Sequence, residues 1–393
     1  MTSQLLVRPL APSEAWFFPV GAYVGYSTRV RGHLDTAALS QAFDDLRRAY
    51  PILSSRLIPD LTGQPAIADA SELPAAFTEC AGNADESMAG LPELDNRTAA
   101  VHVVRDEDDT AAVTLLTHHA VADGHHSLHA LSELWTFYTA HAGGTPLRRR
   151  RQDYPHSLEH ALHQRGISVD VGTPELLGAD IADIEYFRGI PRYARTRLSA
   201  EDTAALTAVG RRHGTTVNGL VSAALLSATA HTMGTDTHAV YYSYAVDLRT
   251  RLTPPIGYPE GTNILAMETF IADPGSDRDP IALARSITDK LRDDIATGAI
   301  YDPRQAANPG DRTTMLAASN WGIIPHLPTP ADLTIEDFHP TGTGHPSPRD
   351  RYSLGTHIIF TFDGQLTVDS VATGINITRP LSESLRALAR HAG

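Results

Sequence analysis

Hydrophobic positions along the chain recur with two periods, the period of two that is typical of strands and the period of about 3.6 that is typical of helices. In the first third, this pattern predicts a strand at 22–30 and a pair of strands at 99–104 and 112–117, joined by a polar turn at 105–110. Residues 58–98 are rich in Pro, Gly, Ala and acidic residues, so we expect a loose excursion there.

Two segments of the first third carry an apolar stripe at helical spacing. Asp35 can cap the first of these helices, and Pro51 stops it. Residues 127–141 predict a longer helix, and Gly143 suits its C-terminal cap. The stripe of the longer helix consists of Leu128, Leu131, Leu134, Trp135 and Tyr138.

The character of the chain changes at 145–190, which carries the run Arg148–Arg151 and many Asp and Gly residues. We interpret this stretch as a crossover linker between an N-terminal lobe, 1–165, and a C-terminal lobe, 166–393. For the second lobe we predict strands at 193–198, 239–246, 313–319, 355–362 and 365–371, and helices at 199–212, 216–232, 280–296 and 382–391. Asp363-Gly364 is a strong signal for a two-residue hairpin turn. This order of elements predicts a mixed α/β (α+β) fold of two similar lobes.

Composition narrows the class of protein. The chain has 32 Lys and Arg against 46 Asp and Glu, and the net charge of −14 disfavours a nucleic-acid binder, which must neutralise phosphates. Cys80 is the only cysteine, so a disulfide framework and a Cys-based zinc site are excluded. Neither an N-terminal targeting signal nor an apolar stretch of about 20 residues is found, so we expect the bacterial cytoplasm.

The segment 117–124, Thr-His-His-Ala-Val-Ala-Asp-Gly, lies between a predicted strand and a predicted helix. A neutral histidine near pH 7 can take a proton from an alcohol or amine nucleophile, and His119 would be that base. Asp123 can fold back across the short loop, pair with an arginine and hold the loop's shape. Gly124 leaves backbone space where a ligand can approach.

Two simpler interpretations of this segment stay open. Five of the chain's 19 histidines fall between His118 and His129, so a histidine-rich surface loop without function is one of them. The other is a metal site, since His125 and His129 are one helical turn apart. No H-E-x-x-H signature accompanies these histidines, so we expect no bound metal.

Residues 118–124 resemble the HHxxxDG signature of the chloramphenicol-acetyltransferase-like superfamily, which includes the condensation domains of nonribosomal peptide synthesis. Further segments resemble this superfamily over nearly the whole chain. These are 49–56, Val246–Arg249, Tyr258–Asn263 and Ser319–Pro325. The last of them is most similar to the branch of polyketide-associated acyltransferases, the phthiocerol dimycocerosyl transferase-like enzymes.

The resemblance implies two lobes in a V with a tunnel between them. It also implies that His119 acts as general base without a covalent acyl-enzyme, supported by His118 and Gly124. Asp123 would pair with Arg249 across the lobes. For the group that stabilises the oxyanion or lines the tunnel, it implies Ser319 or Asn320. We expect Trp321 to pack in the core rather than to contact substrate.

The resemblance further implies a stand-alone enzyme that acts as a monomer. It would need no resident cofactor, and its donor would be an acyl-CoA or a phosphopantetheine-linked acyl group on a carrier protein. Basic patches that could meet such a donor are Arg148–Arg151, Arg211 with Arg212, and Arg304 with Arg312. The acceptor would be a hydroxyl group of a polyketide-type or lipid molecule. Alternatives are amide formation on an amine, a non-catalytic module that docks carrier proteins, and a His-metal hydrolase.

Overall fold

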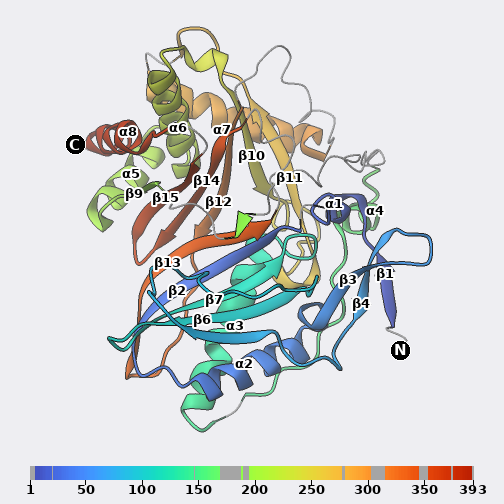
Figure 1. Cartoon of the computed structure of the whole chain (residues 1–393). Coiled ribbons are helices and arrows are strands. Elements are labelled where there is room, and N and C mark those ends of the chain that lie inside the picture. The colour runs from blue at the N-terminus through green and yellow to red at the C-terminus, as the bar shows by residue number, and fades with distance from the viewer. Residues whose placement is uncertain are drawn as a thin grey trace. The chain divides into compact units, whose positions relative to one another are not determined.

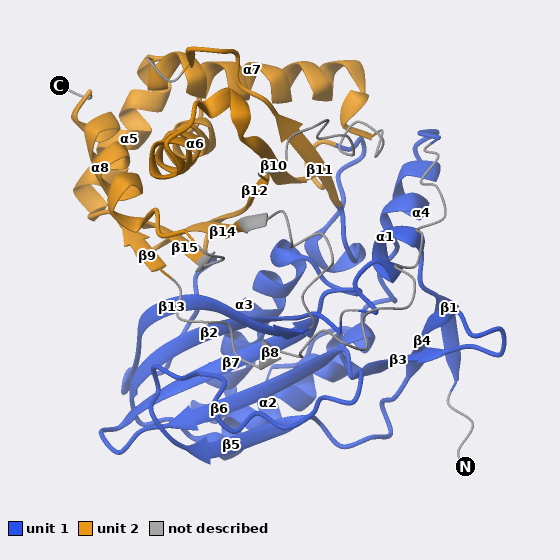
Figure 2. Ribbon diagram, turned by 45° about the horizontal axis from the view of Figure 1, so that its top comes forward, with its two compact units in different colours: residues 1–190, 252–264, 325–346 blue, residues 191–251, 265–324, 347–393 orange. Residues whose placement is uncertain are grey.

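The structure, a computed structural model, describes residues 5–19, 21–145, 147–168, 187–188, 194–276, 279–301, 315–344, 353–372 and 375–391. The chain forms two compact units (Figure 2). The first contains residues 1–190, 252–264 and 325–346, and the second contains 191–251, 265–324 and 347–393. The predicted lobes, 1–165 and 166–393, were continuous in sequence, whereas two later segments of the chain belong to the first unit.

The first unit is built on a six-stranded sheet with the order β5-β6-β7-β2-β13-β8 (Figure 1). Its strands are β5 (Phe77–Ala81), β6 (Ala99–Arg105), β7 (Thr110–His118), β2 (Tyr23–Gly32), β13 (Leu333–Gly344) and β8 (Phe187–Arg188). All nine residues of β7 are buried, as expected of a strand in the middle of a sheet that is covered on both faces. A smaller sheet contains β1 (Leu6–Pro9), β4 (Pro65–Asp69) and β3 (Ser55–Pro59).

Helices α2 (Thr36–Ala49) and α3 (Gly124–Ala142) pack against each other within this unit. Asp35 caps α2 as predicted, because its carboxylate accepts hydrogen bonds from the backbone N–H groups of Ala37 and Ala38. The apolar stripe predicted for α3 is buried throughout. The unit also contains two short helices, α1 (Pro12–Ala15) and α4 (Leu158–His163).

The second unit has one six-stranded sheet with the order β11-β10-β12-β14-β15-β9. Its strands are β11 (Leu265–Phe270), β10 (Tyr241–Asp247), β12 (Met315–Ile323), β14 (Ser353–Phe362), β15 (Gln365–Ala372) and β9 (Ala194–Arg197). Its helices are α5 (Ala200–Arg212), α6 (Val217–Met233), α7 (Pro280–Thr297) and α8 (Thr378–Arg390). The predicted hairpin β14–β15 is confirmed, with φ of 47° at Asp363 and 72° at Gly364.

Three expectations were wrong. The stretch 58–98 is not a loose excursion, because it includes the end of β3 and all of β4 and β5. Strand β13 was missed, since Pro340 and Gly342 conceal its alternating pattern. Strand β11 was missed as well. The described part of the expected linker contains α4, capped by Ser157, while most of its second half lies outside the described residues. No helix among the described residues is long and apolar enough to cross a membrane.

Helix α6 packs so closely on α7 that one position cannot carry a side chain. A Cβ atom on Gly219 would lie 2.7 Å from the carbonyl oxygen of Ala284 and 2.8 Å from Oγ1 of Thr215. Gly219→Ala should therefore reduce the free energy of unfolding by about 1–3 kcal/mol, although alanine favours helices. Urea denaturation measures this, with Ser227→Ala in the same helix as the control. An unchanged midpoint for Gly219→Ala would contradict the predicted packing.

Candidate active site

The histidine motif connects β7 to α3 in the first unit. His118 is the last residue of β7, and Asp123 is the N-cap of α3, so residues 119–122 form a short turn between the two elements. The helix begins at Gly124, three residues before the predicted start. The backbone N–H of His119 donates to the carbonyl oxygen of Ala22 (2.8 Å), which fixes the turn to the start of β2.

His118 is a structural residue. Its side chain is fully buried, its ring lies edge-on to Tyr23, and its Nδ1 accepts a hydrogen bond from the backbone N–H of Ala120 (3.1 Å). Burial lowers the pKa of His118 to about 3, and the neighbouring His119 adds to this shift. His118 is therefore neutral at physiological pH and shapes the turn that presents His119.

His119 is half-buried, and one face of its imidazole is covered by Phe17. The two rings are parallel within 5°, with their centroids 3.9 Å apart. Burial lowers the pKa of His119, and the charge of Asp123 acts in the opposite direction. Nδ1 is buried without a hydrogen-bond partner among the described residues. A neutral imidazole held in one orientation, with Nε2 as its remaining nitrogen, is suited to accept a proton.

Asp123 joins the motif turn to a distant part of the chain. Its Oδ1 accepts from the backbone N–H of His126 (3.0 Å) and its Oδ2 from that of Ile264 (2.9 Å), while its own N–H donates to Thr262 (3.3 Å). The carboxylate is 2% exposed, so these bonds are protected from water. Asp123 therefore bonds to backbone groups of the motif helix and of residues 262–264, which the sequence did not reveal.

Asn263 was noted only as part of the Tyr258–Asn263 resemblance, yet it contacts the motif directly. Its amide group donates to the carbonyl oxygens of His119 (2.8 Å) and Ala120 (3.1 Å). Gly261 adds a further contact, since its carbonyl oxygen lies 3.0 Å from Nδ1 of the buried His126. Residues 261–264 are thus hydrogen-bonded to the motif turn and to the start of α3, and Phe17 covers one face of the His119 ring. No sequence signal indicated Phe17.

The other residues of the motif helix have simpler roles. Gly124 is the first residue of α3. His125 and His129 both stack on Tyr258, and Nε2 of His129 lies 3.2 Å from the hydroxyl of Tyr50. Among the residues that the structure describes, no group of three His, Cys, Asp or Glu side chains could hold a metal ion.

Arg249 belongs to the second unit, two residues after the end of β10. Its side chain is 1% exposed, and its guanidinium donates to Oδ1 of Asp247 (3.1 Å). Arg249 therefore forms a largely buried ion pair within the second unit. The predicted pairing of Arg249 with Asp123 joins residues of the two units and stays a prediction, as does the tunnel.

Ser319, Asn320 and Trp321 lie on β12, with Ser319 opposite Ala245 of β10. Asn320 donates to Oδ1 of Asn218 (2.9 Å) and accepts from the backbone N–H of Gly322 (2.8 Å), so its amide is engaged within the unit. Trp321 is buried, at 5% exposure, as core packing predicts. Ser319 is half-buried.

The arginine patches differ in their surroundings. Arg148–Arg151 are exposed, and Arg149 pairs with Glu133. Arg211 and Arg212 are exposed at the end of α5, where Arg212 donates to the carbonyl oxygen of His391 (2.8 Å). Arg304 and Arg312 lie outside the described residues.

A cavity of about 880 Å³ lies next to the motif turn in the first unit. Its lining includes Phe18 and Pro19, which directly follow the ring that covers His119, and Tyr23, which contacts His118. Apolar side chains from the loop before β6 complete much of the wall. These are Met88, Leu91, Pro92 and Leu94, and the polar residues Glu93, Asp95, Asn96 and Thr343 also line the cavity. The cavity is large enough for a chain-like substrate group.

Comparison with known proteins identifies relatives of the whole chain. The phthiocerol/phthiodiolone dimycocerosyl transferase of Mycobacterium leprae is 29% identical over 402 residues, covering 93% of this chain and 92% of the relative. The enzyme of the same name from Mycobacterium ulcerans is 30% identical over 367 residues, covering 85% of each. The family described as the C-terminus of phthiocerol/phthiodiolone dimycocerosyl transferase matches residues 188–371.

Solved structures agree with these relatives. Polyketide synthase associated protein 5 from Mycobacterium tuberculosis superposes with a TM-score of 0.82 at 28% identity, covering 98% of both chains. The first condensation domain of the calcium-dependent antibiotic synthetase gives a TM-score of 0.63 at 15% identity, covering 98% of this chain and 96% of that domain. The expected fold, shared with condensation domains, is confirmed.

The low pKa of His118 predicts acid sensitivity. Between pH 7 and 5 the unfolded chain protonates this histidine near its ordinary pKa of about 6.5, whereas the folded protein keeps it neutral, so acid favours unfolding. Between pH 7 and pH 5, the free energy of unfolding of His118→Gln should therefore fall by about 2 kcal/mol less than that of the wild type. Urea denaturation at both pH values measures it, and His33→Gln, at an exposed position, is the control. Equal pH dependence of wild type and His118→Gln would contradict the assignment.

Proposed function

Because this chain belongs to the phthiocerol/phthiodiolone dimycocerosyl transferase family and is an acyltransferase, we propose that it transfers an acyl group from a thioester donor to a hydroxyl group of a polyketide-type or lipid acceptor. The observation that carries this proposal is the geometry of His119. Its imidazole is neutral, half-buried and stacked on Phe17, and its backbone carbonyl oxygen accepts a hydrogen bond from Asn263. The relatives are named as phthiocerol/phthiodiolone dimycocerosyl transferases, and these names support the proposed acyl transfer.

In the proposed reaction, Nε2 of His119 removes the proton from the acceptor hydroxyl as the oxygen attacks the thioester carbonyl carbon. The C–O bond forms, and the carbonyl oxygen becomes an oxyanion. When the C–S bond breaks, the thiolate leaves and takes the proton from the imidazolium. The products are an ester and a free thiol, and His119 returns to its neutral form. No step requires an acyl-enzyme, so Cys80 is not needed.

Asp123 is a positioning residue in this scheme, since its carboxylate is used by backbone N–H groups of the motif helix and of Ile264. We propose that Arg249 adds to this arrangement by pairing with Asp123. Ser319 is the better candidate for a donor to the oxyanion, because the amide of Asn320 is already engaged with Asn218 and Gly322.

The donor in this proposal carries its acyl group on a phosphopantetheine thiol, either of CoA or of a carrier protein, and no resident cofactor takes part. Exposed arginines at 148–151 and at Arg211 can meet the phosphates of either donor. We further propose that the cavity beside the motif turn holds an alkyl chain, because Phe18, Tyr23 and Leu91 give part of its wall an apolar surface.

His119→Ala should abolish transfer. Loss of a general base typically costs about 10²–10⁴-fold in kcat, because the acceptor hydroxyl then keeps its proton. The measurement is release of free thiol from acyl-CoA or an acylated carrier protein in the presence of long-chain alcohols, with ester confirmed by mass spectrometry. Amines in parallel reactions test amide formation. His119→Ala that keeps wild-type turnover would refute the proposed mechanism.

Leu91→Trp should fill part of the cavity. We expect kcat/KM for a substrate with a long alkyl chain to fall about tenfold, whereas short-chain substrates change less than about twofold, because only the long chain must enter. Leu61→Trp, at a fully exposed leucine, is the matched control. An equal effect on long and short substrates would show that the cavity does not hold the chain.

A further inference from the structure

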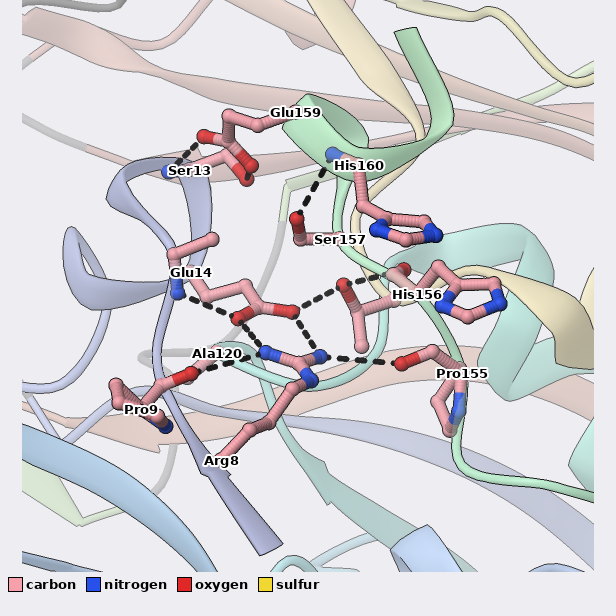
Figure 3. Close-up of polar contacts among 12 residues, drawn as sticks. Arg8, Pro9, Ser13, Glu14, Ala120, Pro155, His156, Ser157, Glu159 and His160 are labelled. Atoms are coloured by element: carbon pink, nitrogen blue, oxygen red, sulfur yellow. Dashed lines mark hydrogen bonds and ion pairs between the residues drawn. The ribbon is translucent and has the colours of Figure 1, made fainter. Parts of the chain in front are cut away.

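Glu14 is a fully buried carboxylate in the N-terminal segment that no sequence motif marks. At 0% exposure, it can stay charged only with compensating partners. Its two oxygens accept hydrogen bonds from both terminal nitrogens of Arg8 (2.6 and 2.7 Å) and from the backbone N–H of Ala11 (2.8 Å). A fourth bond comes from the hydroxyl of Thr262 (2.6 Å), which lies 248 positions away in the sequence. Figure 3 shows the carboxylate facing the Arg8 guanidinium, which also donates to Pro155 (3.1 Å).

Glu14 is connected to the His119 ring through its own segment of the chain, because this segment carries Phe17. Glu14 lies in the short helix α1, and the chain continues from it through Ala15, which ends the helix, and Trp16 to Phe17. The N–H of Phe17 donates to the carbonyl oxygen of Glu14 (3.2 Å), and the ring of Phe17 stacks on His119. The position of α1 therefore determines the position of the ring that covers the imidazole.

A second path leads through Thr262 to the other side of the motif turn. The carbonyl oxygen of Thr262 accepts from the N–H of Asp123, and the next two residues supply the Asn263 amide and the N–H of Ile264. The same segment is held by His156, whose carbonyl oxygen accepts from the N–H of Thr262 (2.9 Å). A shift of Thr262 would therefore move its own carbonyl oxygen, the Asn263 amide and the Ile264 N–H, which are all bonded to the motif.

We infer that Glu14 is a positioning residue for the reaction, since it links the two segments that fix the His119 imidazole, the one that carries Phe17 and the one that carries Thr262 and Asn263. The inference rests on the proposed role of His119 as base. Glu14 touches neither substrate nor the reacting atoms in this assignment. Its function is to keep the ring covered and its Nε2 aimed in one direction.

The chemistry of the junction requires a carboxylate. All four groups that face Glu14 are donors, and glutamine offers only one acceptor oxygen beside an NH₂ group that would itself donate. Glu14→Gln also leaves the Arg8 charge without its partner. Thr262→Val is the milder variant, because it keeps the Arg8–Glu14 pair and every backbone bond of Thr262 and removes only the hydroxyl.

The experiment compares Glu14→Gln, Thr262→Val, Thr262→Ser and a control, Thr28→Val. Thr28 is equally buried, and its hydroxyl donates to Val113 within the sheet (3.1 Å), away from the motif. For Glu14→Gln and Thr262→Val we expect kcat to fall about tenfold or more, with KM changed less than about threefold, because misalignment affects the transition state more than binding. Thr262→Ser keeps the hydroxyl and should restore most of kcat, and Thr28→Val should leave kcat unchanged.

A second readout separates positioning from folding. Burial lowers the pKa of His119, so a looser ring should regain a pKa closer to its ordinary value. Because the neutral form acts as base, the acidic limb of the pH–rate profile should then move to higher pH in Glu14→Gln and Thr262→Val. The titratable groups next to His119, His118 and Asp123, are unchanged in both variants. NMR titration of the His119 ring in the free protein measures the same shift without any substrate.

The outcomes are distinguishable. If folded Glu14→Gln and Thr262→Val keep the wild-type kcat, pH limb and His119 titration, the inference is wrong while the role of His119 stands. A loss of activity that only follows the folded fraction overturns it as well. If the wild-type protein shows no transfer that depends on His119, the proposed function fails, and the NMR titration alone decides whether Glu14 positions the ring.

Discussion

The carboxylate of Asp123 is the interaction on which the rest of the candidate site depends. It caps α3 through His126 and at the same time binds the backbone of Ile264, which is 141 positions away in sequence. These two bonds add to those that Ala22, His118 and Asn263 make to the turn between β7 and α3, and together they fix its geometry. A short loop with one buried anion at its end can be rigid without a disulfide or a metal.

The two neighbouring histidines show how the environment assigns different tasks to the same residue type. His118 points into the core, where burial keeps its pKa near 3 and its Nδ1 serves the backbone of the turn. His119 follows it by one residue and retains partial exposure, and burial lowers its pKa. A strand that ends between them separates the two environments, since successive side chains of a strand point in opposite directions.

Elements that begin or end at a helix cap or a tight turn could be predicted from the sequence. Helices α2 and α5 begin at the predicted caps, Asp35 and Ser199, and the Asp363-Gly364 turn lies where it was expected. Prediction failed where tertiary contacts outweigh local preference, as in β13, in which Pro340 is tolerated because the strand pairs along the whole of β2.

The same limit applies to the site. His119 and Asp123 could be identified as candidate site residues, because both belong to the short HHxxxDG pattern. The groups that hold them come from other parts of the chain, and a stacking phenylalanine or a buried glutamate has no local signature. Asn263 was visible only through the resemblance of its segment to a known family, and its two bonds to the motif backbone could not have been read from residue types.

The pairing of β13 with β2 has a consequence for folding during synthesis on the ribosome. Thr343 lies opposite Tyr23, about 320 positions earlier in the chain. At a synthesis rate of about 5–20 residues per second, the edge of β2 waits roughly 15 to 60 seconds for its partner strand. During that time the unpaired edge of this ten-residue strand is open to other chains. Selection on this family would thus act not only on the finished site but also on how nascent chains are shielded until the last third has emerged.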